Sequence, residues 1–284
     1  VAIDANTAAS AAATADMFRP DASGNVPGRR NHHGWLAAGV PGVMAGLALA
    51  LKEFGTLRLS DALRPAIALT ADGVTVTPAL AGILGKLSAG MRADPGSAEV
   101  LRALARAESI EPLYRGDVAL RLAEAFARNG GLVTAKDLGA YRARLVEPLR
   151  LEWGGRVILT PPLTSGGITV LQVLALLRSL GWERLEGEGP RALARVEALR
   201  LAWRDRLTLL GDPDFSAVPQ ARLLSEDHAR EGAERVRSAL RSGRALDHGV
   251  KPNPQGGTLS FSACDRHGNA AALTLTHGDG FGAQ

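Results

Sequence analysis

Residues 256–276 read GGTLSFSACDRHGNAAALTLT, and this stretch decides the fold. Apolar and polar side chains alternate along both of its halves, which is the period of a half-buried β-strand. Between the halves, residues 265–269 have the composition of a tight connection between strands. The stretch therefore predicts a β-hairpin. Its polar positions are Thr258, Ser260, Ser262, Thr274 and Thr276, and its large apolar positions are Leu259, Phe261, Leu273 and Leu275.

The register of this hairpin follows from its pattern, because a slip of one residue would move every side chain of a strand to the other face. Pairing Cys264 with Ala270 puts both apolar sets on one face. In that register Thr258 stands opposite Thr276 on a face lined with hydroxyl groups. The two threonines are then placed to hydrogen-bond across the strands.

A threonine pair in a hairpin is most often structural, but the residues before Thr258 favour chemistry. Gly256 and Gly257 precede it, at the end of a segment rich in Gly, Pro and Asn (residues 242–257). Such a backbone can adopt the strained geometry in which the Thr258 hydroxyl attacks the Gly257 carbonyl and breaks the chain. The freed α-amino group, with an unperturbed pKa of about 8, would then serve as general base for the hydroxyl. We therefore predict self-cleavage between Gly257 and Thr258, with Thr258 as the nucleophile.

The rest of the chain has the composition of a helix-rich protein. Of 284 residues, 46% are hydrophobic and only 4% are aromatic, which favours closely packed helices rich in Ala and Leu. Helical spacing predicts helices over residues 43–54, 60–71, 117–128 and 168–180, and β-branched residues predict a strand over 156–160. A further helix is expected over residues 191–206, with a buried face that carries Leu193, Val196, Leu199 and Trp203.

Charge and metal-ligand content argue against several classes of function. The formal net charge is +4, but the arginines are spaced singly among Glu and Asp, so we expect no nucleic-acid partner. Cys264 is the sole cysteine, which rules out an internal disulfide or a cysteine-based zinc site within this sequence. His32 and His33 lie in a polar loop without a carboxylate at ligand spacing, so no metal site is predicted. No apolar run of about 18 residues predicts a membrane span.

Motifs spread along the chain resemble those of the γ-glutamyltranspeptidase family, in the same order and over nearly the whole length. The resemblance implies an α+β fold, an αββα sandwich of the N-terminal-nucleophile hydrolase type. It also implies a precursor that cleaves itself before Thr258. The matching stretches are residues 2–4, 12–17, 40–42, 113–116, 129–141, 161–168, 205–206, 210–215, 258 and 265–269.

By this resemblance, residues 1–257 are a large-subunit-like part and residues 258–284 are the start of a small subunit. Together they would form one domain, and after cleavage a heterodimer of the two subunits. The family's N-terminal strands and most of its small subunit, with its Gly-Gly oxyanion hole, have no counterpart in this sequence. We therefore expect the chain to be incomplete at both ends and inactive alone.

The implied reaction is acyl transfer or hydrolysis of γ-glutamyl amides such as glutathione. The acyl group would be held on Thr258 and passed to water or to an amino acid, with no cofactor. Thr276 would hydrogen-bond the nucleophile, a role that the hairpin register predicts independently. Relatives are often exported, which implies a periplasmic or secreted protein, although residues 1–13 lack the features of a signal peptide.

Three positions bear on substrate specificity. Asn6 stands where the family has an arginine for the substrate carboxylate, and a neutral amide cannot make the bidentate, charge-assisted contact of a guanidinium. Gly278 stands where the family often has an asparagine that holds the substrate amino group. His277 directly follows Thr276 and is a further candidate substrate contact.

Two alternatives to a standard γ-glutamyl specificity remain open. The first is a related amidase that accepts another acyl group, such as a glutaryl amide or poly-γ-glutamate. The second is a non-catalytic fragment or scaffold, which would leave the bond between Gly257 and Thr258 intact.

Overall fold

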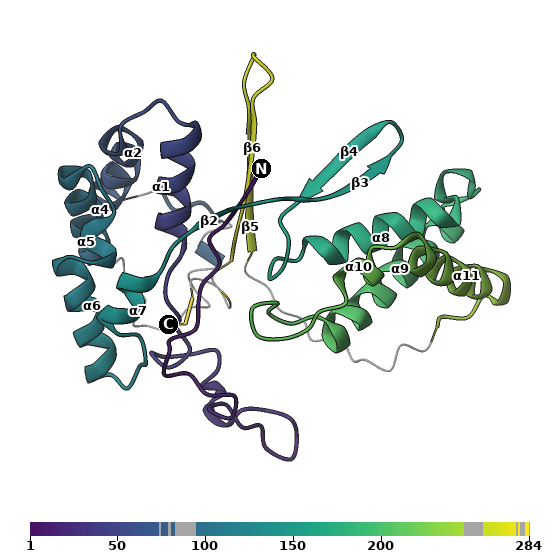
Figure 1. Cartoon of the computed structure of the whole chain (residues 1–284), viewed down its shortest axis with the longest axis horizontal. Coiled ribbons are helices and arrows are strands. Elements are labelled where there is room, and N and C mark those ends of the chain that lie inside the picture. The colour runs from purple at the N-terminus through teal and green to yellow at the C-terminus, as the bar shows by residue number, and fades with distance from the viewer. Residues whose placement is uncertain are drawn as a thin grey trace. The chain divides into compact units, whose positions relative to one another are not determined.

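The computed structural model describes residues 1–73, 75–78, 81–82, 95–246, 258–276, 278 and 282–283. The chain divides into two compact units (Figure 1). The first unit comprises Val1–Asp4 and Leu145–Asn253, and the second comprises Ala5–Arg144 and Pro254–Gln284. The predicted division at residues 257 and 258 into parts of one domain stays a prediction.

The second unit is built mainly from helices. Its core is filled around Leu104 and Tyr114, which are 0% and 1% exposed, and a second cluster surrounds Val40 and Leu138. The predicted helices over residues 43–54, 60–71 and 117–128 are present, with bounds shifted by a residue at most. The helices are α1 (Val43–Phe54), α2 (Leu59–Asp72), α4 (Pro95–Ala107), α5 (Glu111–Tyr114), α6 (Asp117–Arg128) and α7 (Ala135–Ala140), preceded by η1 (Pro27–Arg29).

The strands outside the hairpin form two small sheets. Strand β1 (Ala2–Asp4) pairs with β2 (Arg144–Val146), and β3 (Leu149–Trp153) pairs antiparallel with β4 (Arg156–Thr160). The connection from β3 to β4 is Gly154-Gly155, with φ of 59° and 71°. Two consecutive positive φ angles suit the right-handed twist of a two-residue hairpin, and glycine adopts them without steric cost.

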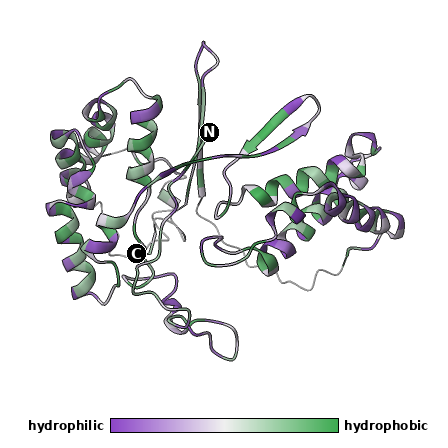
Figure 2. Cartoon of the chain, in the orientation of Figure 1, coloured by the Kyte–Doolittle hydropathy of each residue, from purple (hydrophilic) through white to green (hydrophobic). Residues whose placement is uncertain are grey.

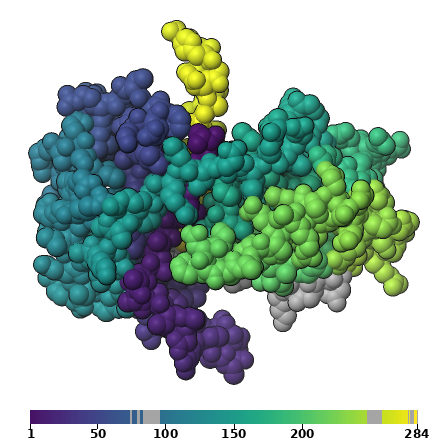
Figure 3. Space-filling model, viewed as in Figure 1, coloured from purple at the N-terminus to yellow at the C-terminus, as the bar shows by residue number. Residues whose placement is uncertain are grey.

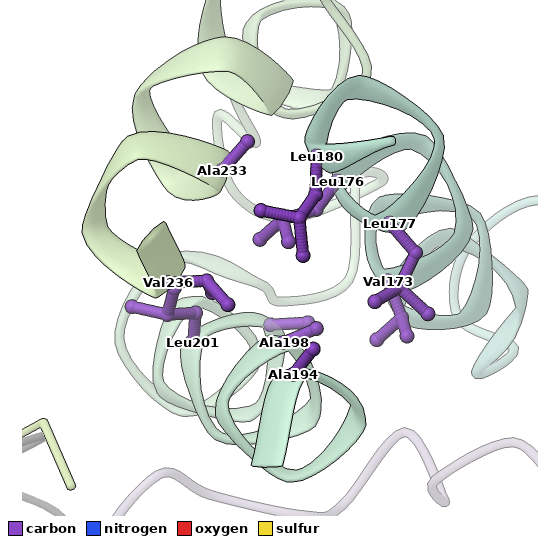
Figure 4. Packing of buried hydrophobic residues seen from close by; sticks show 10 residues of the cluster. Val173, Leu176, Leu177, Leu180, Ala194, Ala198, Leu201, Ala233 and Val236 are labelled. Carbon is purple, nitrogen blue, oxygen red and sulfur yellow. The ribbon is translucent and has the colours of Figure 1, made fainter. Parts of the chain in front are cut away.

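Three helices of the first unit pack around one apolar core: α8 (Gly167–Leu180), α9 (Glu188–Leu209) and α11 (Glu226–Ser242). Figure 4 shows Leu176 and Leu180 of α8 facing Ala198 of α9 and Ala233 of α11. The short elements η2 (Trp182–Arg184) and α10 (Gln220–Leu223) connect them. In Figure 2, α8 is largely apolar and α11 largely polar, so α8 supplies most of the bulk of this core.

The predicted buried face of α9 is wrong. Val196, Leu199 and Trp203 are 49%, 55% and 44% exposed, and the guanidinium of Arg206 lies over the Trp203 ring. The opposite face is buried because its small side chains allow α8 and α11 to approach closely. That buried face consists of Ala194, Glu197, Ala198, Leu201, Ala202 and Asp205.

The two buried carboxylates of α9 each have hydrogen-bond partners, as burial of a charge requires. Asp205 Oδ2 accepts from Gln172 of α8 at 3.2 Å and lies 2.8 Å from Nε2 of His228 on α11. Glu197, which is fully buried, accepts from the backbone N–H of Leu246 at 3.3 Å. These contacts tie α9 to both neighbouring helices and to the segment that follows α11.

Among the described residues, no helix combines the length and apolar character that crossing a membrane requires.

Candidate active site

The predicted β-hairpin is confirmed, as strands β5 (Thr258–Cys264) and β6 (Ala270–Thr276) (Figure 1). In the space-filling view of Figure 3 its atoms are yellow. Its turn is organised by Asp265. That carboxylate accepts hydrogen bonds from the backbone N–H groups of His267 and Asn269 at 2.8 and 2.9 Å. Hydrogen bonds, above all from the Asn269 side chain, hold the pKa of Asp265 below its usual value. Gly268 completes the turn with φ of 85°.

The predicted register is also confirmed. Cys264 pairs with Ala270 and Thr258 pairs with Thr276. The hydroxyl oxygens of Thr258 and Thr276 are 3.0 Å apart, within hydrogen-bond distance, and either can be the donor. The next hydroxyl pair on the same face, Ser260 and Thr274, is more widely spaced at 3.5 Å.

Both faces of the hairpin are largely open to solvent. Thr258 and Cys264 are exposed on the hydroxyl face, and Leu259, Phe261 and Leu273 are 53%, 56% and 39% exposed on the apolar face. Thr258 is the first residue of β5, and its exposed hydroxyl is accessible to the carbonyl group of a substrate. The paired hydroxyl of Thr276 can hold it in orientation or pass a proton to it.

Three predicted site residues flank this pair in sequence. Gly257, one half of the predicted cleavage site, and His277 lie outside the described residues, as does Gly256. Gly278 is described and has φ of 76°, and within the described part of the chain no atom beyond its own neighbours lies within 4 Å of the position that a Cβ would occupy. Among larger residues, asparagine tolerates this left-handed conformation best.

Asn6 lies on a separate segment, residues 5–11, which follows β1. It is exposed, and its carbonyl accepts a hydrogen bond of 2.7 Å from the hydroxyl of Tyr141. Two residues further on, Ala8 and Val40 exchange backbone hydrogen bonds of 3.2 and 2.8 Å. The backbone that carries Asn6 is therefore held against residues 40–42 and Tyr141.

The residues that hold this segment do not follow from the sequence patterns above. One local pattern does point to them: Thr134 and Asp137 have the spacing of a capping box, and they form one at the start of α7. Asp137 also accepts from the backbone N–H of Ala11 at 2.9 Å, a contact that no local pattern reveals.

The sequence matches the gamma-glutamyltranspeptidase family over residues 1–100 and 91–284. It is 32% identical to the glutathione hydrolase proenzyme of Escherichia coli strain K12, over 99% of this chain and 53% of that protein. It is 33% identical to the acylase ACY 1 proenzyme of Pseudomonas sp. strain V22, over 100% of this chain and 55% of that protein. The chain thus spans about half the length of the curated relatives it matches.

Among solved structures, the chain is similar to the gamma-glutamyltranspeptidase from Pseudomonas nitroreducens complexed with L-DON. The TM-score is 0.73 and the identity 29%, over 82% of this chain and 76% of that one. This likeness confirms the predicted fold class, a helix-rich α+β fold of the N-terminal-nucleophile hydrolase type.

Proposed function

Because this chain belongs to the gamma-glutamyltranspeptidase family, we propose that it is the part of a self-cleaving acyl-transfer enzyme that carries the nucleophile, Thr258. The substrates are γ-glutamyl amides of the glutathione type. The acyl acceptor is water or an amino acid. The observation that carries this proposal is the pair of hydroxyl oxygens on Thr258 and Thr276, 3.0 Å apart on an open strand face.

Self-cleavage activates the nucleophile. The Thr258 hydroxyl oxygen attacks the carbonyl carbon of Gly257, the peptide bond between them breaks, and the Thr258 nitrogen takes the proton. Water then hydrolyses the resulting ester. The products are a carboxylate on Gly257 and a free α-amino group on Thr258, which has a pKa near the working pH. Residues 1–257 then belong to a large subunit and Thr258 begins a small subunit, and the two form a heterodimer.

Turnover uses the same hydroxyl. The α-amino group of Thr258 takes the hydroxyl proton as the oxygen attacks the amide carbonyl of the substrate. The leaving amine departs with that proton, and an ester on Thr258 remains. Water or an amino-acid amine then attacks the ester and releases the acyl group. Thr276 orients the nucleophile through the hydroxyl contact described above.

Acyl specificity depends on the segment that carries Asn6. A neutral amide there weakens recognition of the α-carboxylate of a γ-glutamyl group. A glutaryl group carries the same carboxylate and lacks only the α-amino group, so Asn6 affects both acyl groups alike. Gly278, which stands in place of the family's asparagine for that amino group, is the position that favours glutaryl, and one relative is named an acylase proenzyme. Measuring kcat/KM for matched γ-glutamyl and glutaryl anilides separates the two specificities. Gly278 and His277 are the positions at which substitution is expected to change this ratio.

The proposal is tested by the intact mass of the full-length protein before and after incubation at neutral pH. We expect two fragments divided between Gly257 and Thr258. Thr258→Ala should give a single mass and no turnover, whereas Thr258→Ser keeps a hydroxyl and should still cleave. Cleavage of the alanine variant at the same bond would remove Thr258 from the mechanism. An intact wild-type chain would favour the non-catalytic scaffold.

A further inference from the structure

The segment 5–11 is held at its start by Tyr141, whose ring stacks on that of Tyr114. The rings of Tyr114 and Tyr141 lie 5.9 Å apart between centroids and are inclined by 18°. Tyr114 is buried, and its hydroxyl donates to the Pro41 carbonyl at 2.7 Å and accepts from the Ala45 N–H at 3.2 Å. Tyr141 stacks on this buried ring, and its own hydroxyl donates to the Asn6 carbonyl.

Glycines at positions 39 and 42 make this close approach sterically possible. A Cβ on Gly42 would lie 2.1 Å from the Tyr141 hydroxyl oxygen and 2.2 Å from the Ala5 carbonyl oxygen. A Cβ on Gly39 would lie 2.6 Å from the Ala8 carbonyl oxygen. Both distances to backbone oxygens are far inside van der Waals contact, so any side chain at either position would push the segment away.

The other end of the segment is held by Asp137. Its carboxylate accepts from the Ala11 N–H at 2.9 Å and lies 3.1 Å from the hydroxyl oxygen of Ser10. The Ser10 hydroxyl is buried and also lies 2.8 Å from the carbonyl oxygen of Leu132. Residues 134–141 thus hold the segment at both ends, through Tyr141 at residue 6 and through Asp137 at residues 10–11.

We propose that Tyr141 and Asp137 are positioning residues that set the direction of the Asn6 amide toward the acyl group of the substrate. This inference rests on the proposed function. The net charge of a guanidinium attracts a carboxylate even when the two groups are not aligned, whereas a neutral amide contributes only through its directed N–H and C=O groups. The contribution of the Asn6 amide to substrate binding therefore depends on how firmly the backbone at residue 6 is held. A small displacement of a binding group greatly weakens its interaction with the substrate.

The experiment compares two hydroxyl deletions in the stacked pair, each made in the full-length, processed protein. Tyr141→Phe removes the bond to Asn6 and keeps the stacked ring. Tyr114→Phe removes two bonds in the core and leaves the segment's own contacts in place. We expect Tyr141→Phe to raise KM about fivefold with kcat within twofold of wild type. The reason is that a misplaced Asn6 amide would lose about one hydrogen bond to the bound substrate. Tyr114→Phe should lower the melting temperature more but leave KM within about twofold.

A double-mutant cycle separates positioning from a general loss of structure. In an Asn6→Ala background, Tyr141→Phe should no longer raise KM, because the group that it positions is gone. An unchanged KM in Tyr141→Phe, or equal changes in both tyrosine variants, would overturn the positioning role while the proposed function stands. If the wild-type protein turns over neither γ-glutamyl nor glutaryl amides, the proposed function fails and this inference fails with it.

Discussion

Asp137 links stability to pH at a single residue. Partial burial alone would raise its pKa, but hydrogen bonds from Thr134, Ala11 and Ser10 outweigh burial and lower the pKa from 3.8 to about 2. A carboxyl group whose folded-state pKa is lowered stabilises the protein above its unfolded-state pKa. That contribution is lost as the pH falls from about 4 toward about 2.

We therefore expect Asp137→Asn to reduce the free energy of unfolding by about 1 kcal/mol at pH 7, after allowance for solvent screening, and by much less near pH 2. Urea unfolding at several pH values measures both. Asp227→Asn is a suitable control, because that carboxylate is 77% exposed and pairs with Arg230 at the surface. A loss that stays constant from pH 7 to pH 2 would contradict the role assigned to the Asp137 charge.

For single residues, the sequence predicts contacts within one local element but not contacts between residues far apart along the chain. Thr258 and Thr276 could be paired in advance because one hairpin and its period of two relate them. The support of Asn6 could not, because Tyr141 is 135 residues away along the chain. The reason for glycine at position 42 likewise exists only in three dimensions, where Ala5 and Tyr141 both approach it.

At the scale of the hairpin, the two hydroxyl pairs provide an internal comparison. Thr276→Val keeps the β-branched shape that suits a strand but removes the hydroxyl 3.0 Å from Thr258. Thr274→Val makes the same change at the wider pair, 3.5 Å from Ser260. We expect Thr276→Val to slow self-cleavage about tenfold or more and Thr274→Val to change it less than about twofold. Time courses on denaturing gels of the full-length protein measure both rates, and equal slowing would argue against a special role for Thr276.

In helix α9, the hydrophobic periodicity of the sequence predicts the wrong buried face. Two of its faces repeat every three or four residues, one with Val196, Leu199 and Trp203 and the other with Ala198 and Leu201. Hydrophobicity favours the first face, but tertiary packing buries the second, because small residues let three helices converge. The buried Glu197 and Asp205 also make that second face look polar in sequence. Helix α11 gives only a weak hydrophobic signal in the sequence for a related reason, since its buried face consists of Ala229, Ala233, Val236 and Ala239.

Across the whole molecule, positive charge is dispersed. Acidic partners lie beside many of the arginines, as in the pairs of Arg58 with Glu108 and Arg121 with Glu99. With a formal net charge of +4 over 284 residues, we expect binding to duplex DNA to be weaker than about 100 µM at about 150 mM salt. Fluorescence anisotropy with a short labelled duplex measures this. Micromolar binding with a steep dependence on salt would show a phosphate-binding surface and contradict the expectation.

The position of Cys264 has a practical consequence. It is the sole cysteine of the chain, is exposed, and shares the hydroxyl face of β5 with Thr258. Cys264 lies six positions after Thr258 on the strand, with five residues between them, a span of about 20 Å. A maleimide fluorophore would therefore attach to this chain at one point, on the strand that begins with the proposed nucleophile and well clear of it. The chain thus carries its own labelling site for following the hairpin by fluorescence during the proposed self-cleavage.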